Sequence, residues 1–391
     1  MYLLYWGSIA LVIYTYVGYG ILLYVLVRIK RLFSAPKPVA DDYTTDVTVV
    51  VAAYNEEDWI GEKIKNCLDF DYPREHLHLL FVTDGSNDRT PQVIADYPKP
   101  EGARIELYHR DERKGKIAAV NRIMPFVASP VVIYTDANTV VNKEAVRNIV
   151  RHFADPKVGA VAGEKRISLG DRAEASGAGE GIYWKYESAL KRWDSELYSV
   201  VGAAGELFAI RRSLFEHISE DTIVEDFLTT MRIAQQGYKV VYEPNACAAE
   251  TSSASVGEEL KRKIRIAAGG MQAIVRLAPV LNIFKYGMLS FQYISHRVLR
   301  WTLAPLALIL IFVLNVFMLN DGLIYQGMML AQLAFYLFAG LGYILETRQM
   351  KVKAFFVPYY FCMMNYAVFR GFFRFLAGRQ SVLWERAQRA A

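Results

Sequence analysis

The stretch Val131–Val140, with the sequence VVIYTDANTV, joins an apolar run to two polar side chains. The run Val-Val-Ile-Tyr has strand character, and a strand that ends here presents Asp136 and Asn138, two residues apart, on one side of the chain. Side-chain oxygens at a strand tip suit a hard divalent cation that keeps positions open for phosphate oxygens. An ordinary exit from strand to turn explains the same residues, because Asp and Asn are common in turns.

Residues 46–257 predict an α/β domain around this stretch. Strands are expected at VTVVVAA, LHLLFVTD, RIELYHR and VVIYTD, and helical spacing separates them at 58–69, 93–97 and 114–124. Strands that alternate with helices predict a mostly parallel sheet covered on both faces. The strand ends carry Tyr54-Asn55-Glu56, Asp84-Gly85-Ser86, Arg110-Asp111 and Asp136 with Asn138. Ligands of such sheets bind beyond the carboxyl ends of the strands, so these residues predict one site.

Apolar residues concentrate at the two ends of the 391-residue chain, whose hydrophobic fraction is 53%. Residues 2–27 are an uncharged run long enough to cross a bilayer, and basic residues follow at 28–31. A cleaved signal peptide fits poorly, because the run is long and lacks a preceding basic residue. We expect residues 1–30 to be an N-terminal transmembrane helix whose basic end lies in the cytoplasm. Residues 31–45, with Pro36 and Pro38, are expected to be a linker.

The C-terminal part predicts further membrane segments. Residues 258–300 are expected to be amphipathic interfacial helices, ending in the basic stretch 293–301. In the C-terminal membrane region, 301–391, the apolar runs 303–319 and 323–345 predict a hairpin through the bilayer. The segment 354–369 is shorter, contains Pro358, and fits either a third span or an interfacial helix. The basic tail that follows favours a cytoplasmic end, and hence the second choice.

Charge and cysteine content narrow the class of protein. The net charge of +5 is modest and needs no nucleic-acid partner to explain it. Cys67, Cys247 and Cys362 are far apart and lack the spacing of a disulfide framework or a zinc site. The absence of a disulfide pattern and the basic clusters beside the apolar runs together predict a multi-pass protein of the cell (inner) membrane. Its folded domain is expected in the cytoplasm.

The chain resembles the inverting membrane glycosyltransferases of glycosyltransferase family 2, the group that includes cellulose, chitin and hyaluronan synthases. The resemblance covers about residues 46–270 and rests on six motifs in order: AAYNEE (52–57), TDGSNDRT (83–90), RKGKIAAVN (113–121), TDAN (135–138), VVGAAGELFAIRR (200–212) and IVEDFLTT (223–230). It implies a GT-A-like, Rossmann-like domain that uses a nucleotide-diphosphate sugar and a divalent metal ion, Mg²⁺ or Mn²⁺.

The resemblance assigns the first strand ends to the sugar donor. Its implied donor-binding residues are Ala53, Tyr54, Glu56 and Asp84 at the base and ribose, Lys116 near the diphosphate, and Asp136 with Asn138 at the donor and metal. Asn138 replaces the usual second aspartate, which should weaken metal affinity although an amide oxygen can still ligate. Thr83 replaces an aspartate of many members, which leaves the base open between uridine, the commonest in the family, and others.

The resemblance also implies a general base. Asp226 matches the carboxylate that takes the proton of the acceptor hydroxyl, with Glu225 beside it. An acidic first turn that complements the helix dipole explains this pair without catalysis. The small residues Gly202, Ala203 and Gly205 would line the acceptor end of the site, where they allow close backbone approach. The aromatic stripe within 180–187 fits a packed core better than a sugar platform.

Residues 262–266 stand where the family carries Gln-x-x-Arg-Trp. Arg265 matches the arginine and can pair with a donor phosphate, while Arg262 takes the place of the glutamine on the acceptor side. Ile266 replaces the tryptophan, which weakens any inference of processive synthesis. A basic amphipathic helix on the inner membrane surface explains the same residues without catalysis.

We therefore predict a membrane-embedded inverting β-glycosyltransferase that extends a polysaccharide or modifies a lipid-linked acceptor. Membrane lipids surround it, and a homo-oligomer or an export partner would help to form a product path, because three or four spans make a narrow one. A non-processive transferase that adds one sugar to a lipid acceptor is the second interpretation. A non-catalytic sugar-nucleotide-binding subunit of an export complex is the third, and Asn138 is its main support.

Overall fold

The computed structural model describes residues 1–35, 39–40, 42–168, 176–251, 256–348, 350 and 352–378. The prolines of the predicted linker, the basic tail and the side chains of the aromatic stripe up to residue 184 lie outside this description. The chain divides into two compact units. The helical unit comprises Met1–Ile29, Leu169–Leu190 and Ala254–Arg379, and the sheet unit comprises Lys30–Ser168, Lys191–Ser253 and Gln380–Ala391. The domain boundaries drawn from the sequence stay predictions.

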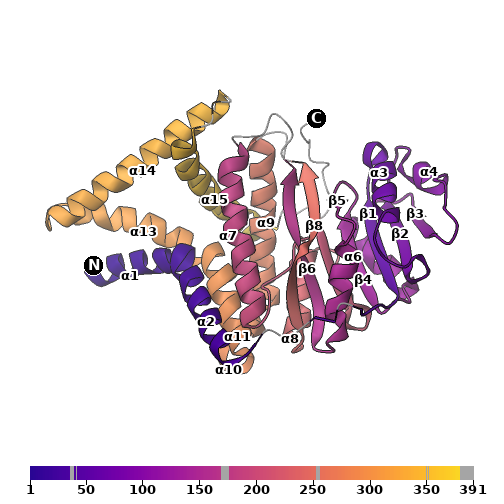
Figure 1. Cartoon of the computed structure of the whole chain (residues 1–391). Coiled ribbons are helices and arrows are strands. Elements are labelled where there is room, and N and C mark those ends of the chain that lie inside the picture. The colour runs from indigo at the N-terminus through magenta and orange to yellow at the C-terminus, as the bar shows by residue number, and fades with distance from the viewer. Residues whose placement is uncertain are drawn as a thin grey trace. The chain divides into compact units, whose positions relative to one another are not determined.

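The sheet unit is built on an eight-stranded sheet of order β3-β2-β1-β4-β7-β6-β8-β5 (Figure 1). Its strands are β1 (Val47–Ala53), β2 (Leu77–Asp84), β3 (Arg104–Arg110), β4 (Val131–Asp136), β5 (Val140–Val141), β6 (Val158–Ser168), β7 (Leu207–Arg211) and β8 (Lys239–Thr251). The neighbours β3, β2, β1 and β4 run parallel, whereas β7 is antiparallel to both β4 and β6. The prediction of a mostly parallel sheet is confirmed.

Helices follow the parallel strands, as the pattern predicts. They are α3 (Glu57–Leu68), α4 (Thr90–Ala95), α5 (Lys116–Ile123) and α6 (Ala145–Val150), with α8 (Glu225–Gln235) later in the chain. Helix α4 starts three residues before the predicted 93–97, because Pro91 suits the first helical turn. Helix α5 starts two residues late, because Gly115 with φ 99° directly precedes it in a conformation no helix continues.

The strand register brings the predicted polar ends to one edge of the sheet. Ala53 of β1 pairs with Thr83 of β2, and Ala52 pairs with Asp136 of β4. The strands themselves are buried, which is why β1, β2 and β4 read as nearly continuous apolar runs rather than as alternating ones. The residues that directly follow these strands therefore meet above the same buried layer.

The helical unit contains long apolar helices near both ends of the chain. Its elements are α1 (Tyr2–Ile13) with a π-turn leading into α2 (Tyr19–Phe33), α7 (Ser176–Leu197), α9 (Val256–Arg276), α10 (Ile283–Tyr286), α11 (Met288–Tyr293), α12 (Leu299–Trp301), α13 (Leu303–Phe317), α14 (Leu323–Thr347) and α15 (Lys353–Leu376). Helices α2 and α7 each end within the sheet unit. Helices α13 and α14 are joined by the short turn that the sequence predicts (Figure 1).

Among the described residues, two helices are long and apolar enough to cross a membrane, namely Tyr2–Phe33 and Leu323–Thr347. A third candidate combines Met288–Trp301 with α13 and is bent by 51° between them. The bend has a local cause, because Pro305 has no N–H for the carbonyl of Trp301. Alone, the 15 residues of α13 reach only about 22 Å, short of the hydrocarbon core. The interfacial placement of 293–301 stays a prediction.

A buried ion cluster holds α7 within the helical unit, and the sequence pattern does not reveal it. Glu187 is 2% exposed and pairs with His296 Nε2 at 3.1 Å, Arg297 Nη2 at 2.7 Å and Arg300 Nη1 at 3.0 Å. Burial alone would raise the pKa of Glu187, but the cations hold it well below its ordinary value. The basic residues of 293–301 therefore pair with a carboxylate inside the protein.

Replacement of Glu187 by alanine should strongly destabilise the protein. The substitution leaves a buried imidazole and two partly buried guanidinium groups without their carboxylate, and such a loss costs about 3–5 kcal/mol. Glu196→Ala is the matched control on the same helix, since it removes the more exposed ion pair with Arg31, worth about 1 kcal/mol or less. Thermal unfolding in detergent measures both. Equal shifts of the unfolding midpoint would contradict the special role of Glu187.

Candidate active site

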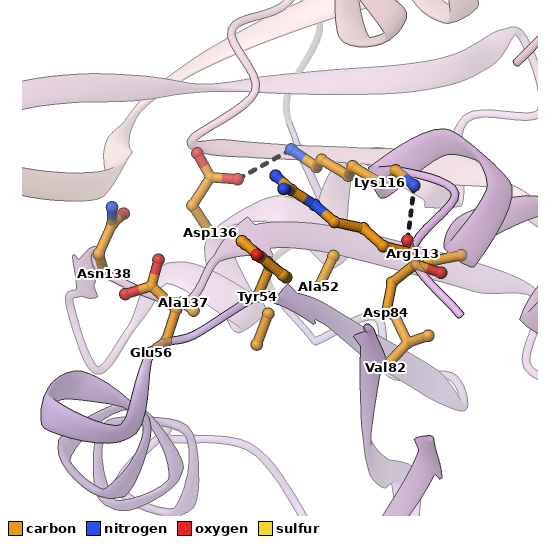
Figure 2. Close-up of a pocket in the computed structure, with 13 residues that line it drawn as sticks. Ala52, Tyr54, Glu56, Val82, Asp84, Arg113, Lys116, Asp136, Ala137 and Asn138 are labelled. Atoms are coloured by element: carbon orange, nitrogen blue, oxygen red, sulfur yellow. Dashed lines mark hydrogen bonds and ion pairs between the residues drawn. The ribbon is translucent and has the colours of Figure 1, made fainter. Parts of the chain in front are cut away.

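A pocket opens in the sheet unit at the carboxyl ends of β1, β2 and β4, where the sequence predicts a site (Figure 2). Its lining residues are Ala52, Ala53, Tyr54, Glu56, Val82, Asp84, Arg113, Gly115, Lys116, Ala119, Asp136, Ala137 and Asn138. The structure thus brings together seven of the predicted residues, namely Ala53, Tyr54, Glu56, Asp84, Lys116, Asp136 and Asn138. Their individual roles stay predictions.

The loop after β1 is fixed by hydrogen bonds to the loop after β2. Asn55 has φ 53°, an unusual conformation for a residue other than glycine. Its side chain donates to Asn87 Oδ1 at 2.7 Å and accepts from the Asn87 N–H at 3.0 Å. The N–H of Glu56 donates to Thr90 Oγ1 at 2.8 Å. These bonds hold the backbone between Tyr54 and Glu56, so both side chains have a defined position in the pocket.

Asp84 fixes the loop that enters α5. Its Oδ2 accepts hydrogen bonds from the backbone N–H groups of Lys114, at 2.7 Å, and of Gly115. Gly85, with φ 71°, donates its N–H to the carbonyl of Arg110. A Cβ on Gly85 would lie 2.5 Å from the Cβ of Arg113, so the two backbones touch. Asp84 thus orders this loop, a role that the prediction of a base or ribose contact did not include.

The same loop carries Arg113, a residue that the sequence analysis missed as a site residue. The guanidinium carbon of Arg113 lies 3.7 Å from the centroid of the Tyr54 ring, within the range of a cation–π contact (Figure 2). Arg113 is the first residue of the motif RKGKIAAVN, and its place in this motif was the only sign in the sequence that it belongs to the site. A planar cation over an aromatic ring offers two flat faces to a nucleotide base, because bases stack on either kind of group.

Lys116 connects the end of β4 to the first turn of α8. Its Nζ lies 2.8 Å from Asp136 Oδ1 and 3.0 Å from Glu225 Oε1. Burial alone would lower the pKa of Lys116, but the two carboxylates outweigh it and raise the pKa above its usual range. Burial raises the pKa of Asp136 despite the lysine beside it. The lysine is therefore a permanent positive charge between two parts of the predicted site.

Asp226 follows Glu225 in the first turn of α8. Burial and the neighbouring Glu225 raise the pKa of Asp226 to about 7. A Cβ on Gly205 would lie 3.3 Å from Asp226 Oδ2 and 3.8 Å from Lys116 Nζ, so the three residues adjoin. A carboxylate with a pKa near neutrality can both accept and release a proton at physiological pH. Asp226 also lies where it complements the helix dipole, and the two interpretations are compatible.

The small residues predicted at the acceptor end pack against the start of α8. Gly202 has φ 81°, and a Cβ there would lie 2.0 Å from the Phe227 ring. The N–H of Ala203 donates to Thr230 Oγ1 at 3.0 Å. Larger side chains would therefore push the loop away from the helix that carries Asp226.

Beyond this loop, the ammonium of Lys165 bonds Glu206 and, at 2.5 Å, Glu250. Lys165 is 4% exposed, so this buried lysine, like the partly buried Lys116, lies between two carboxylates. Arg262 and Arg265 belong to α9 of the helical unit, where Arg262 pairs with Glu259 through two hydrogen bonds of 2.9 Å. The roles of Arg262 and Arg265 toward acceptor and phosphate stay predictions.

The oxygen donors of the pocket fit part of a divalent metal site. Asp136, Asn138 and Glu56 all line it, and carboxylate and amide oxygens are ligands that Mg²⁺ and Mn²⁺ accept (Figure 2). Among the described residues, no group of three or more His, Cys, Asp or Glu side chains gathers in a form that could hold a metal ion. The protein would thus supply only some ligands, and the oxygens of a bound diphosphate suit the remaining positions.

The fold is shared with a solved glycosyltransferase. A mannosyltransferase from Pyrobaculum calidifontis, solved in complex with GDP-Man and Mn²⁺, superposes with a TM-score of 0.71. The similarity covers 96% of this chain and 100% of the mannosyltransferase, at 23% sequence identity. At this identity the likeness shows the fold, and it confirms the predicted GT-A-like architecture.

Sequence comparison finds a family match for part of the chain. Residues 48–219 match the sequence model of glycosyl transferase family 2, so the chain carries a domain of that family, as its motifs predict. Poly-beta-1,6-N-acetyl-D-glucosamine synthase of Staphylococcus aureus is 27% identical over 271 residues, which are 68% of this chain and 64% of the relative. The synthase of Staphylococcus epidermidis is 24% identical over 263 residues, 65% of this chain and 62% of the relative. The chain thus spans somewhat less than two thirds of these curated relatives.

Gly85→Ala should disturb the pocket more than its backbone conformation alone would predict. A residue other than glycine at positive φ costs about 1–2 kcal/mol, and here the added Cβ must also displace the backbone of Arg113. Gly102→Ala is the matched control, because Gly102 has φ 79° but no atom within 4 Å of the added Cβ. We expect weaker nucleotide binding, measured by calorimetry, only for Gly85→Ala. Equal affinities of the two variants would contradict the loop anchor.

Proposed function

We propose that this protein is a membrane glycosyltransferase that moves a sugar from a nucleotide-diphosphate donor to a growing polysaccharide or a lipid-linked acceptor. The proposal rests on the two ion pairs of Lys116. They connect Asp136, the residue predicted to bind the donor and the metal ion, with Glu225 in the turn predicted to carry the general base. The family 2 domain and the similarity to staphylococcal polysaccharide synthases support the reaction class and a polysaccharide product. The candidate spans support a multi-pass membrane protein. We place its catalytic domain in the cytoplasm because basic residues follow the first apolar run.

In this proposal, the pocket binds the donor from base to diphosphate. The base stacks on Tyr54 and the ribose lies toward Asp84 and Glu56. Lys116 faces the diphosphate and stabilises the charge that grows on it as it leaves. Asp136 and Asn138 would hold a Mg²⁺ or Mn²⁺ ion, which neutralises charge on the diphosphate when bound. Because the related fold was solved with GDP-Man and uridine donors are the commonest in the family, both bases need testing.

Transfer follows from the position of Asp226 at the acceptor end. An acceptor hydroxyl approaches along the small residues 202–205 and gives its proton to the carboxylate of Asp226. Its oxygen forms a bond to the anomeric carbon while the bond from that carbon to the diphosphate oxygen breaks. Attack from the side opposite the leaving group inverts the configuration, which gives a β-linked product from an α-linked donor.

A single-addition transferase remains the second candidate, because Ile266 replaces the tryptophan of the processive motif. The length of the product separates the two: a ladder of oligomers indicates a processive synthase, and one added sugar indicates a single transfer. A binding subunit without catalysis, the third candidate, would bind a donor and release no nucleoside diphosphate from it.

Asp226→Asn should abolish transfer while donor binding survives. Loss of a general base lowers the rate by about 10²–10⁴-fold. Wild type and variant would be assayed in detergent with a panel of UDP- and GDP-sugars and Mn²⁺ or Mg²⁺, for release of nucleoside diphosphate. Glu225→Gln is the neighbouring control, expected to lower the rate less. Turnover by Asp226→Asn at the wild-type rate would remove the base assignment, and binding without any wild-type turnover would favour the binding subunit.

The rate should depend on pH through Asp226. Its carboxylate is the active form and its pKa is raised to about 7, so kcat should rise about tenfold per pH unit below 7 and level off above it. In Glu225→Gln the midpoint should move to lower pH, because the charge that raises the pKa of Asp226 is gone. Initial rates at saturating donor between pH 5.5 and 8.5 measure this. A flat profile in the wild type would contradict it.

A further inference from the structure

Helix α3 contributes two polar side chains to the segment that carries Asp136 and Asn138. The Nζ of Lys63 donates to Thr135 Oγ1 at 2.9 Å, to the carbonyl of Thr139 at 2.9 Å and to Thr139 Oγ1 at 3.3 Å. Asn66, one turn later, accepts from the N–H of Val141 at 2.9 Å and donates to its carbonyl at 2.7 Å. Both side chains act on the backbone that begins and ends the turn.

The turn itself is closed through the same oxygens. Thr139 Oγ1 donates to the carbonyl of Asp136 at 2.9 Å and lies 3.1 Å from Thr135 Oγ1. The ammonium of Lys63 therefore ties residue 135 to residue 139, and the residues between them include both predicted oxygen ligands, Asp136 and Asn138. These ligands line the pocket, whereas Lys63 is only 2% exposed.

A lysine in this position is not explained by packing. Its neighbours on the buried face of α3 are Ile60, Ile64 and Cys67, and an apolar side chain would fill the space without a charge. Burial lowers the pKa of Lys63, and the electrostatic effects of Cys67 and Asp136 oppose it. These three hydrogen bonds match the three N–H donors of an ammonium group, so the group orders three oxygens at once.

We propose that Lys63 is a positioning residue for the metal motif, whose ammonium holds the Thr135–Thr139 turn so that Asp136 and Asn138 face the pocket together. The proposal rests on the function proposed above, since it assumes that these two residues take part in metal and donor binding. The positioning of these ligands matters more in this motif than in a motif with two aspartates. A neutral amide is a weaker ligand than a carboxylate, so its contribution depends on being held in place.

The test compares Lys63→Met and Lys63→Gln with wild type. Lys63→Met keeps the length of the side chain without donors, and Lys63→Gln restores donors without the charge. Lys65→Met is the matched control, because it removes an exposed lysine from the same helix. Hydrogen–deuterium exchange of residues 131–141 reports on the turn. Mn²⁺ titrations of UDP and GDP binding, against binding of each nucleotide without metal, report on the site.

Lys63→Met should speed exchange in 131–141 while 104–110 exchanges as in wild type. It should raise the Mn²⁺ concentration for half-maximal nucleotide binding about 10–100-fold, the usual effect of removing an outer-shell partner. Metal-free binding should stay within about twofold, since the loops of Tyr54 and Asp84 are held by other bonds. Lys63→Gln should recover part of both effects, and Lys65→Met should match wild type.

Unchanged exchange in 131–141, or an unchanged Mn²⁺ response, overturns the proposal. A parallel loss of metal-free binding and of thermal stability also overturns it, because Lys63 would then support the fold in general. If Lys63→Met does not fold, Thr139→Val removes the Oγ1 bonds and keeps Lys63, and a wild-type result there overturns the proposal. If wild type binds neither UDP nor GDP, the proposed donor falls, and exchange in 131–141 alone decides the role of Lys63.

Discussion

The ammonium of Lys116 lies between Asp136 and Glu225, and the arrangement of the candidate site depends on this pair of contacts. Two elements far apart in the sequence meet there: β4 ends with the carboxylate of Asp136, and α8 begins with an acidic first turn. Without a cation between them, these partly buried carboxylates would repel one another and Asp226, because charges interact strongly where water is scarce. Lys116 reaches this position because Gly115, in a left-handed conformation, turns the chain into α5 directly before it.

Buried lysines recur at the edges of this site, and each orders oxygens of a different segment. Lys63 bonds the two ends of the turn that carries Asp136, and Lys165 bonds Glu206, next to the small loop at the acceptor end. Lysine is seldom fully buried unless it is paired. Two such residues near one pocket therefore indicate that the segments at the sheet edge are fixed before any ligand arrives, which lowers the entropy that binding has to overcome.

The parts of the fold that follow local rules could be predicted from the sequence. Apolar and β-branched residues predicted β1 to β4, and the polar residues after them predicted the pocket, because parallel strands end at a common edge. Contacts between distant segments could not be predicted in this way. Glu187 looks like one more polar residue in an aromatic stripe, and only the folded chain places it against His296, Arg297 and Arg300.

Lys63 and Arg113 illustrate why the sequence hid part of the site. In the stretch GEKIKNC, Lys63 and Lys65 look alike, although Lys63 falls on the buried side with Ile60 and Ile64 at helical spacing. This helical spacing was the signal in the sequence that Lys63 is buried. Because buried lysines are rare, the spacing alone was not enough to predict it. Arg113 sits in a polar loop, and its place over Tyr54 depends on Asp84, which binds the loop backbone.

Asn138 is the strongest argument from the sequence against metal-assisted catalysis, and the charges around the pocket weaken it. The carboxylates of Asp136, Glu225 and Asp226 outnumber the ammonium of Lys116 even without a second aspartate in the motif. Burial is the largest cause of the raised pKa of Asp226, and the charges of Glu225 and Glu206 add to it. Negatively charged groups around a pocket attract a cation through their summed field. One carboxylate fewer among the direct ligands therefore lowers the affinity for a metal ion, but the site still favours a cation.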